Sequence, residues 1–463
     1  MSILQKNSQK QTRSSGQMDM IHGPLTRNII AFSLPLAATS ILQQLFNSAD
    51  TAVVGRFDNA RALAAVGTNG EIISLFVSLF TGLSIGANVL IASYIGMGKT
   101  KKINEAVHTI MSIALICGFV MLLAGQFIAE PLLRMIDTPE DVMDLAVEYL
   151  KLYFLGSPFL MLYNFGAAIL RAKGDTKRPL YALLLSGVVN VFLNLFFVIV
   201  CHMSVAGVAL ATDISTAISA VIVLICLQKE EETFRFQWRK LSLQKEYCGK
   251  VFAIGLPAGI QGAVFCFSNV FIQAAINSFG SNAVAGAAAA LNFEYFSYYM
   301  VQAFAQAATT FTSQNWAARE WKRCRRIFSC SMLWGAVFAA AISIPLVVFR
   351  AEAIQLYSTE AAVQEFAYIR IMTVLILEPL CVIYEIPAAA LRGMGHSTIP
   401  AVETILGTVV FRLIWLSTVF VHWRTFRMIF WVYPISWMFT GVLLMISYGL
   451  AVYSWNRKHA AGN

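Results

Sequence analysis

One acidic residue, Asp50, stands in a long apolar stretch where a charge is expensive. It lies late in the run 28–55, no basic residue precedes it within a helical turn, and Arg56 lies beyond the end of the run. A charge at the bilayer centre costs about 2.5 to 3.5 kcal/mol on insertion scales, so each such residue needs a reason. A buried carboxyl group could take up and release a proton or hold a sodium ion. The alternative is that Asp50 caps the following loop near the membrane surface.

Two later apolar runs carry polar residues that could complete a site around this acid. Asn190 and Asn194 lie four positions apart and therefore share one face of a helix. Amides on an apolar face can simply hydrogen-bond to neighbouring membrane helices. Together with Asp50, and with Thr212 and Asp213 of the next run, they could instead form an oxygen-rich pocket for a cation.

The second half of the chain has its own acids. Glu294 lies within N-F-E-Y-F-S-Y-Y-M, where aromatic residues including Tyr298 surround it in sequence. An acid among aromatic rings suits a lipophilic organic cation through charge attraction and cation–π contact. The rings could also pack in the core or lie at the membrane interface. Further acids in the second half are Glu378, Glu385 and Glu403.

The composition indicates that lipid surrounds most of the chain. Of 463 residues, 58% are hydrophobic and only 13% are charged, which is more apolar surface than a soluble domain could bury. A helix needs about 20 mainly apolar residues to cross the hydrocarbon core, and the apolar runs are far longer than barrel strands. We therefore predict an all-α integral membrane protein with twelve transmembrane helices, at roughly 28–55, 64–97, 103–128, 142–172, 179–201, 204–227, 250–277, 284–317, 324–349, 362–392, 398–421 and 426–454.

The basic residues predict how these helices are oriented. Most of the 34 Lys and Arg residues lie in the tails, the even-numbered connections and the segment after Gln228, whereas the odd-numbered connections hold Arg56, Arg61, Arg134, Arg350, Arg424 and Arg427. Because Lys and Arg gather on the cytoplasmic side, we expect both termini in the cytoplasm and the protein in the plasma membrane. Lys151, Arg370 and Arg412 fall within predicted helices. The net charge of +9 follows this topology and does not indicate a nucleic-acid partner.

The chain contains two related halves. The segment L-R-A-K-G-D-T-K-R-P at 170–179 returns as L-R-G-M-G-H-S-T-I-P at 391–400, 221 positions later, and Pro35 and Asn47 answer Pro257 and Asn269 at 222. Six crossings per half make a parallel repeat with the substrate between two six-helix lobes. We predict a cytoplasmic tail at 1–27, an N-lobe at 28–227, a linker at 228–249, a C-lobe at 250–455 and a cytoplasmic tail at 456–463.

The second half does not repeat the polar residues of the first. At the same offset Phe411 and Trp415 stand where Asn190 and Asn194 predict amides, and Ile272 answers Asp50. The ion site is therefore expected in the first lobe alone.

The chain resembles a multidrug and toxic compound extrusion (MATE) transporter over residues 28 to about 455. The resemblance rests on the L-P opening of runs one and seven, D-T-A-V-V-G at 50–55, S-Q-N-W after run eight, and the repeated L-R-x-x-G-x-x-x-x-P. It implies export of organic cations and amphipathic toxins in exchange for protons or sodium, by rocking of two lobes. It also implies a cation-coupling site and a helix that bends on protonation, matched here by Asp50, Asn190, Asn194 and Thr212 and by Pro35.

The sequence departs from the family pattern at two places. Asn194 replaces an acid often found in the fifth run, which leaves the pocket at Asp50 less negative and less suited to sodium. Run seven lacks a glutamate that some branches use, and Gln261 is its nearest polar residue. Glu294 and Glu385 remain as acids of the second lobe, and we expect substrate to contact Glu294, Tyr298, Glu385 and Gln261. The coupling ion stays open between proton and sodium.

Three rival functions need a distinguishing feature. A flippase for lipid-linked saccharides from the same superfamily would show a strongly cationic cavity. A membrane-embedded hydrolase would need Ser84, within a G-x-S-x-G match, in a polar cleft; we interpret Gly82 to Gly86, like Gly255 to Gly259, as close helix packing. A passive channel would not move substrate uphill. We expect no enzyme activity, no cofactor and no resident metal, and a monomer that handles small organic cations or amphipathic molecules.

Overall fold

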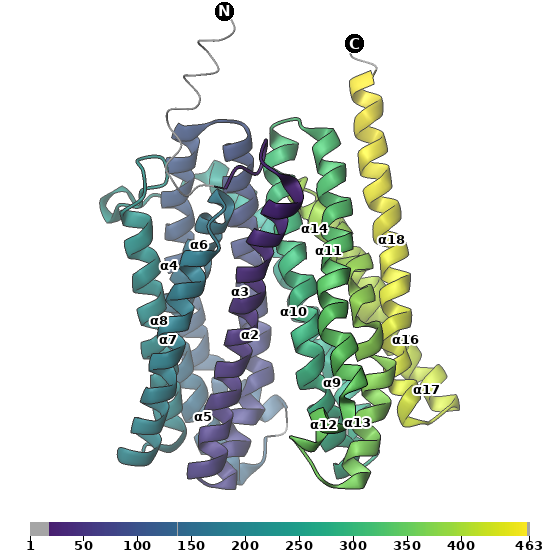
Figure 1. Cartoon of the computed structure of the whole chain (residues 1–463). Coiled ribbons are helices and arrows are strands. Elements are labelled where there is room, and N and C mark those ends of the chain that lie inside the picture. The colour runs from purple at the N-terminus through teal and green to yellow at the C-terminus, as the bar shows by residue number, and fades with distance from the viewer. Residues whose placement is uncertain (1–17, 137, 461–463) are drawn as a thin grey trace, which may run out of the picture.

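The computed structural model describes residues 18–136 and 138–460, and the regular elements of these residues are helices. Figure 1 shows two bundles side by side, with the start of the first helix and the end of the last at the same end of the molecule. The predicted all-α architecture of two lobes is confirmed.

The first lobe contains six spans. They are α2 (Leu25–Phe57), α3 (Ala60–Gly96), α4 (Thr100–Met135), the pair α5 (Glu140–Leu155) and α6 (Ser157–Lys173), α7 (Lys177–Leu195) with its π-helical continuation η1 (Phe196–Val200), and α8 (Ser204–Gln228). The pair α5 and α6 is bent by 46° at Gly156. Pro158 in the first turn of α6 lacks a backbone N–H, so the helix cannot continue unbroken there.

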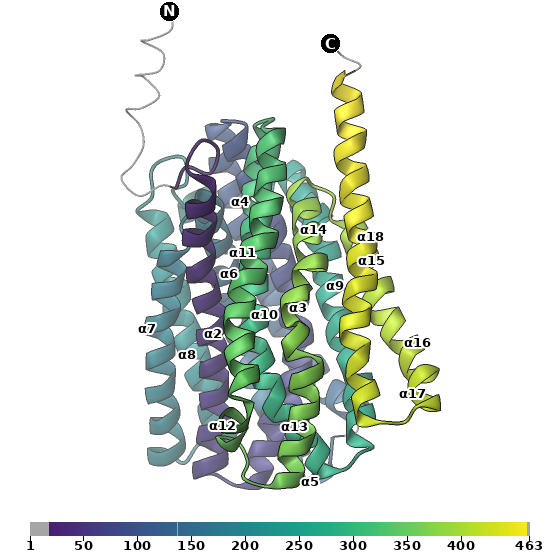
Figure 2. The same cartoon turned by 45° about the vertical axis from the view of Figure 1, so that its right-hand side comes forward.

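The second lobe also contains six, with more interruptions. They are α9 (Lys245–Asn277), α10 (Ser281–Ala317), α11 (Trp321–Val348) followed by the short α12 (Arg350–Gln355), the run of α13 (Ala361–Thr373), η3 (Leu375–Cys381) and α14 (Val382–Gly393), the run of α15 (Thr398–Thr404), η4 (Ile405–Val410), α16 (Phe411–Ser417) and α17 (Val419–His422), and α18 (Phe426–Ala460). Figure 2 shows α18 standing at the outer edge of this lobe.

Eleven of the twelve predicted spans have the composition of membrane helices. Ten are long and apolar enough to cross a membrane by themselves, and the bent pair of α5 and α6 makes an eleventh. The remaining span, α10, has 37 residues, about 55 Å at 1.5 Å per residue, and is long enough to cross. It packs against α2, α3, α11, α13 and α14. Because protein surrounds it, its Ser, Thr and Gln side chains need not face lipid.

The predicted lobe boundaries need small corrections. The first helix begins at Leu25, so only part of the expected tail 1–27 precedes it, and residues 1–17 lie outside the described residues. The last helix runs to Ala460, past the predicted boundary at 455. The second lobe begins at Lys245, so the expected linker 228–249 shrinks to the segment between α8 and α9. Phe234 and Phe236 of that segment are buried against the first lobe.

Glycines form the central contact between the lobes. A side chain on Gly82 would overlap the backbone of Gly259, and one on Gly86 would overlap the backbone of Val251 and Gly255. The absence of side chains lets α3 and α9 approach closely, as predicted from the two small-residue motifs. Ser84 of α3 is buried, and its hydroxyl donates to the Thr81 carbonyl of the same helix at 2.7 Å. The hydroxyl is therefore engaged with its own helix, unlike a nucleophile in the polar cleft that a hydrolase requires.

Hydrogen bonds join the lobes at the end that holds the start of α2 and the end of α18. Thr310 donates to Asn88 at 2.9 Å, and Gln314 donates to the Ala172 carbonyl at 2.7 Å. Tyr247 donates to Glu105 at 2.6 Å. Because these residues lie in the helix halves nearest that end, the lobes are held together there.

The residues before α2, which we call the leading segment (18–24), contact both lobes. Met20 is buried in the core of the second lobe, and its carbonyl accepts a hydrogen bond from Asn315 at 3.1 Å. Arg323 donates to the Gly23 carbonyl at 2.6 Å. On the other side, Gly174 of the first lobe lies against Met18 and Met20. The leading segment thus bridges the lobes at the end where they are closed.

The glycine of the repeated L-R-x-x-G motif has the same backbone role in both lobes. Gly174 ends α6 with φ +103°, and Gly395 follows α14 with φ +91°. Only glycine adopts this left-handed conformation without strain, and it stops a helix. The motif is therefore a helix terminator that was kept in both copies.

Candidate functional site

Asp50 is held inside the first lobe. It lies on α2, and its side chain is 8% exposed. Asn194 of α7 donates a hydrogen bond to Oδ1 of Asp50, and Thr212 of α8 donates to Oδ2 at 3.4 Å. Among the ion pairs of the described residues, none includes Asp50. The carboxylate thus has neutral donors on both oxygens and no basic partner.

The two amides predicted to share a face do so. Asn194 also donates to Oδ1 of Asn190 at 3.2 Å, and both side chains are buried. The Oδ1 atom of Asn194 is buried and has no hydrogen-bond partner. Thr212 has a second, shorter bond to the Val208 carbonyl at 3.0 Å, so its contact with Asp50 is the weaker one. The four predicted coupling residues are therefore neighbours, with a carbonyl oxygen still unused beside the acid.

A polar cavity of about 300 Å³ opens beside this cluster. Asp50 is the only charged residue among those that line it, and most of the others carry hydroxyl or amide groups: Ser40, Gln43, Gln44, Asn47, Tyr153, Tyr163, Ser186, Asn190, Thr212, Ser215, Thr216, Ser219 and Tyr299. Asp213, which we expected in the same pocket, is only half-buried and lies against Gly156 instead. Asp50 is therefore the only acid among the residues that line this cavity.

Pro35 lies inside α2, fifteen residues before Asp50 in the sequence, and the helix continues through it. Its ring removes one backbone donor, and Thr39 donates its hydroxyl to the Pro35 carbonyl at 2.8 Å. α2 therefore has a local weak point on the same helix as the buried acid.

Glu294 is not the free acid that the sequence suggested. Arg370 of α13 donates to both of its oxygens, from Nε at 2.7 Å and from Nη2 at 2.8 Å, and both side chains are buried. A carboxylate already neutralised by a bidentate guanidinium has little left to offer a cationic substrate. Direct contact of Glu294 with such a cation stays a prediction, and the carboxylate would share its charge with Arg370.

The other expected substrate residues lie in two neighbouring hydrogen-bonded groups. Tyr298 donates its hydroxyl to Glu385 at 3.0 Å, and Gln302 donates to the same carboxylate at 3.0 Å. Gln261 instead accepts a hydrogen bond from Arg392 at 3.3 Å. Of the four expected residues only Glu294 and Tyr298 line one cavity, which belongs to the second lobe.

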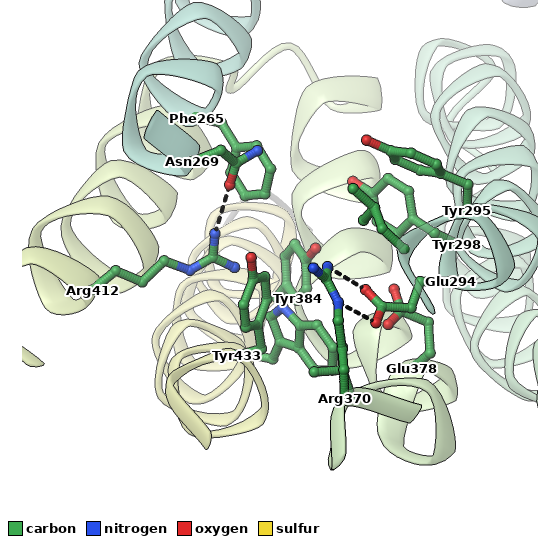
Figure 3. Close-up of a pocket in the computed structure, with 13 residues that line it drawn as sticks. Phe265, Asn269, Glu294, Tyr295, Tyr298, Arg370, Glu378, Tyr384, Arg412 and Tyr433 are labelled. Atoms are coloured by element: carbon green, nitrogen blue, oxygen red, sulfur yellow. Dashed lines mark hydrogen bonds and ion pairs between the residues drawn. The ribbon is translucent and has the colours of Figure 1, made fainter. Parts of the chain in front are cut away.

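Two basic residues of that cavity were not selected from the sequence. Arg370 and Arg412 both line it and are both buried (Figure 3). The signal was available, because a base inside a membrane helix is as costly as an acid. Applied to Arg370 and Arg412, the argument that selected Asp50 would have found them.

Comparison with known proteins places the chain among transporters. A profile of the MatE family matches it twice, over residues 35–196 and 257–418, two ranges that lie 222 positions apart and confirm the internal repeat. The probable multidrug resistance protein YoeA of Bacillus subtilis (strain 168) is 26% identical over 448 residues, covering 93% of this chain and 94% of that protein. The probable multidrug resistance protein NorM of Thermotoga maritima is 25% identical over 405 residues, covering 84% of each chain. A solved structure described as the outward-facing conformation of a multidrug resistance MATE family transporter has a TM-score of 0.89 and 21% identity, and covers 96% of this chain and 100% of the other.

Proposed function

The chain belongs to the MatE family, and on that premise we propose that it is a secondary antiporter that exports cationic or amphipathic drugs and toxins in exchange for protons or sodium ions. The lobes would rock about the glycine contact between α3 and α9 and open the space between them to each side in turn. The observation that carries this proposal is the Asp50 carboxylate, buried and bonded by neutral donors alone.

The surroundings of Asp50 suit an ion that binds reversibly. A buried charge without a partner is costly, and a proton or a sodium ion would remove that cost while bound. The unused Oδ1 of Asn194 and the hydroxyl of Thr212 are oxygen ligands of the kind that a hard cation prefers. Binding of the ion at Asp50 would relax its bond to Asn194 and change how α2 packs against α7.

Pro35 offers a way for this change to reach the lobe interface. α2 packs on α7 inside its own lobe and on α10 and α11 of the other. A helix bends most easily where a proline has removed a hydrogen bond. Ion binding near Asp50 would therefore move the part of α2 around Pro35 relative to the second lobe.

A flippase for lipid-linked saccharides is the less favoured reading. Such a protein would need a strongly cationic cavity to hold pyrophosphate groups. The first-lobe cavity has one acid and no base among its lining residues, and the second-lobe cavity has as many acids as bases.

The test is ethidium export by the purified protein in proteoliposomes, with proton and sodium gradients imposed separately. We expect Asp50→Asn to abolish uphill export, and Asn194→Ala to weaken it more than Thr212→Val because Asn194 makes the closer bond to the carboxylate. Asp213→Asn is the matched control on α8 and should keep export. Undiminished uphill export by Asp50→Asn would contradict the proposal, and downhill movement alone by the unaltered protein would indicate a passive channel.

A further inference from the structure

Arg412 is a buried base without a direct ion-pair partner among the residues that the structure describes. Its side chain is 0% exposed, and its one hydrogen bond runs from Nη1 to Oδ1 of Asn269 at 3.4 Å. Its Nε and Nη2 atoms are buried without a hydrogen-bond partner. Arginine keeps its proton in proteins, so the positive charge cannot be removed by deprotonation. The rings of Tyr433 and Phe265, at 4.4 and 5.0 Å from Cζ, offset only part of the cost of burial.

The free donors lie at the wall of a cavity. Arg412, Asn269 and Tyr433 line the second-lobe cavity, which has a volume of about 90 Å³. In Figure 3 the guanidinium group points inward between Asn269 and Tyr433, while the carboxylates of Glu294 and Glu378 lie together on the far side with Arg370. Neither acid is therefore the partner of Arg412. One end of the cavity offers N–H donors and positive charge, and the other end holds the Glu294–Arg370 ion pair with Glu378 beside it.

The internal repeat makes this cavity the counterpart of the cation cavity. Asn269 answers Asn47, and each lines the cavity of its own lobe. The offset between the halves is 222 at Pro35 and Asn47 and 221 from Pro158 to Pro179, and the π-helical turns of η4 then fit one more residue into the second copy. Beyond η4 the offset is 222, which is also the distance between the ends of the two profile matches at 196 and 418. Arg412 then corresponds to Asn190. The expectation that Phe411 takes this position is thereby corrected.

We propose that the second-lobe cavity binds an anionic group, a carboxylate or a phosphate, of an amphipathic molecule, with Arg412 as its main donor. A planar guanidinium with two adjacent free N–H groups matches the two oxygens of such a group. The cavity, about 90 Å³, has room for a small charged group beside Arg412. The inference rests on the proposed function in one respect: the molecule that carries the group is taken to be the exported one.

The test is equilibrium binding, which needs no ion gradient and so remains informative if the antiport proposal fails. Purified protein in phosphatidylcholine nanodiscs is titrated with the anionic dye carboxyfluorescein and, separately, with the cationic dye ethidium, by fluorescence anisotropy. We expect Arg412→Gln to weaken carboxyfluorescein binding at least about tenfold and to leave ethidium binding unchanged. Arg412→Lys keeps the positive charge but loses the two adjacent N–H donors. Its affinity for carboxyfluorescein should therefore lie between those of the unaltered protein and Arg412→Gln. Arg326→Gln, an exposed arginine of α11, is the matched control and should bind both dyes as the unaltered protein does.

A second arm identifies the source of the anionic group and guards against loss of folding. If a lipid head group occupies the cavity, phosphatidylglycerol in the nanodiscs will compete with carboxyfluorescein; if a soluble substrate does, the lipid will have no effect. Should Arg412→Gln fail to fold, Arg412→Lys alone carries the comparison. Equal carboxyfluorescein affinity in the unaltered protein and the folded Arg412 variants, or no binding to the unaltered protein in either lipid, would overturn the proposal.

Discussion

Arg370 donates from two nitrogens to the two carboxylate oxygens of Glu294, at 2.7 and 2.8 Å, and both side chains are buried inside the second lobe. The pair joins α10 to α13 across 76 positions of sequence. It fixes the broken part of the second lobe to the helix that lies between the lobes. The pair therefore has a structural role, and its two charges neutralise each other.

Removing one member of this pair should destabilise the protein more than removing both. Breaking a buried ion pair costs about 3–5 kcal/mol because one charge is left uncompensated, whereas replacing both groups is often nearly neutral. We expect thermal unfolding in detergent to show a large fall in Tm for Glu294→Gln, which strands a permanent positive charge. Arg370→Met should cost less because a stranded carboxylate can take up a proton.

The double variant Glu294→Gln, Arg370→Met should recover part of the lost stability. Additive losses in the double variant would show that the two residues act independently. A direct role of Glu294 in binding cations would appear instead as weakened ethidium binding by Glu294→Gln without a fall in Tm.

The glycine contact between α3 and α9 should not tolerate a side chain. A methyl group on Gly86 would overlap the backbone of α9, so Gly86→Ala must push the helices apart. We expect a lower Tm and a lower yield of folded protein for Gly86→Ala. Gly67→Ala in the same helix meets nothing within 4 Å and should be neutral or stabilising by about 0.5–1 kcal/mol. A fall in Tm of equal size in both variants would refute the packing role.

The segment between α8 and α9 should be held to the first lobe by an ion pair whose strength depends on pH. Burial of Glu230 opposes its ionisation, but Lys173, whose Nζ lies 2.6 Å away, and Arg178 outweigh it, and the pKa of the Glu230 carboxyl lies below its usual value. The stabilisation is therefore complete above the ordinary glutamate pKa of about 4.3 and is lost as the pH falls through the lower, folded-state value.

Thermal unfolding can measure this dependence. At about pH 7 we expect Glu230→Gln to lower Tm, and we expect the difference from the unaltered protein to shrink below about pH 4. Glu231→Gln is the matched control, since Glu231 is an exposed neighbour, and should have little effect at either pH. A difference for Glu230→Gln that stays constant down to low pH would contradict the ion-pair explanation.

Hydropathy was sufficient to predict the spans because each one is a long apolar run. All twelve predicted ranges correspond to helical segments whose ends differ by up to seven residues. The interruptions were missed: the bend at Gly156 and the irregular turns of η3 and η4 leave the average hydropathy unchanged. They depend on proline, on local hydrogen bonding and on packing, which a window average does not detect.

The sequence predicted the residues around Asp50 better than it predicted those of the second-lobe cavity. Asp50, Asn190 and Asn194 were found because polar groups in lipid are conspicuous and because residues four apart share a helical face. The partner of Glu294 was missed because Arg370 lies on another helix, and sequence alone does not show which helices face each other. Arg412 was misaligned because a constant repeat offset cannot represent the extra residue that η4 accommodates.

The leading segment has a consequence for the transport cycle. Residues 18–24 touch Gly174 in one lobe and Asn315 and Arg323 in the other, so parting the lobes at this end must peel the segment away from one wall. The leading segment therefore holds the two lobes together at this end. In the proposed rocking cycle, substitutions in residues 18–24 would change how readily the lobes separate at this end and would leave both binding cavities intact.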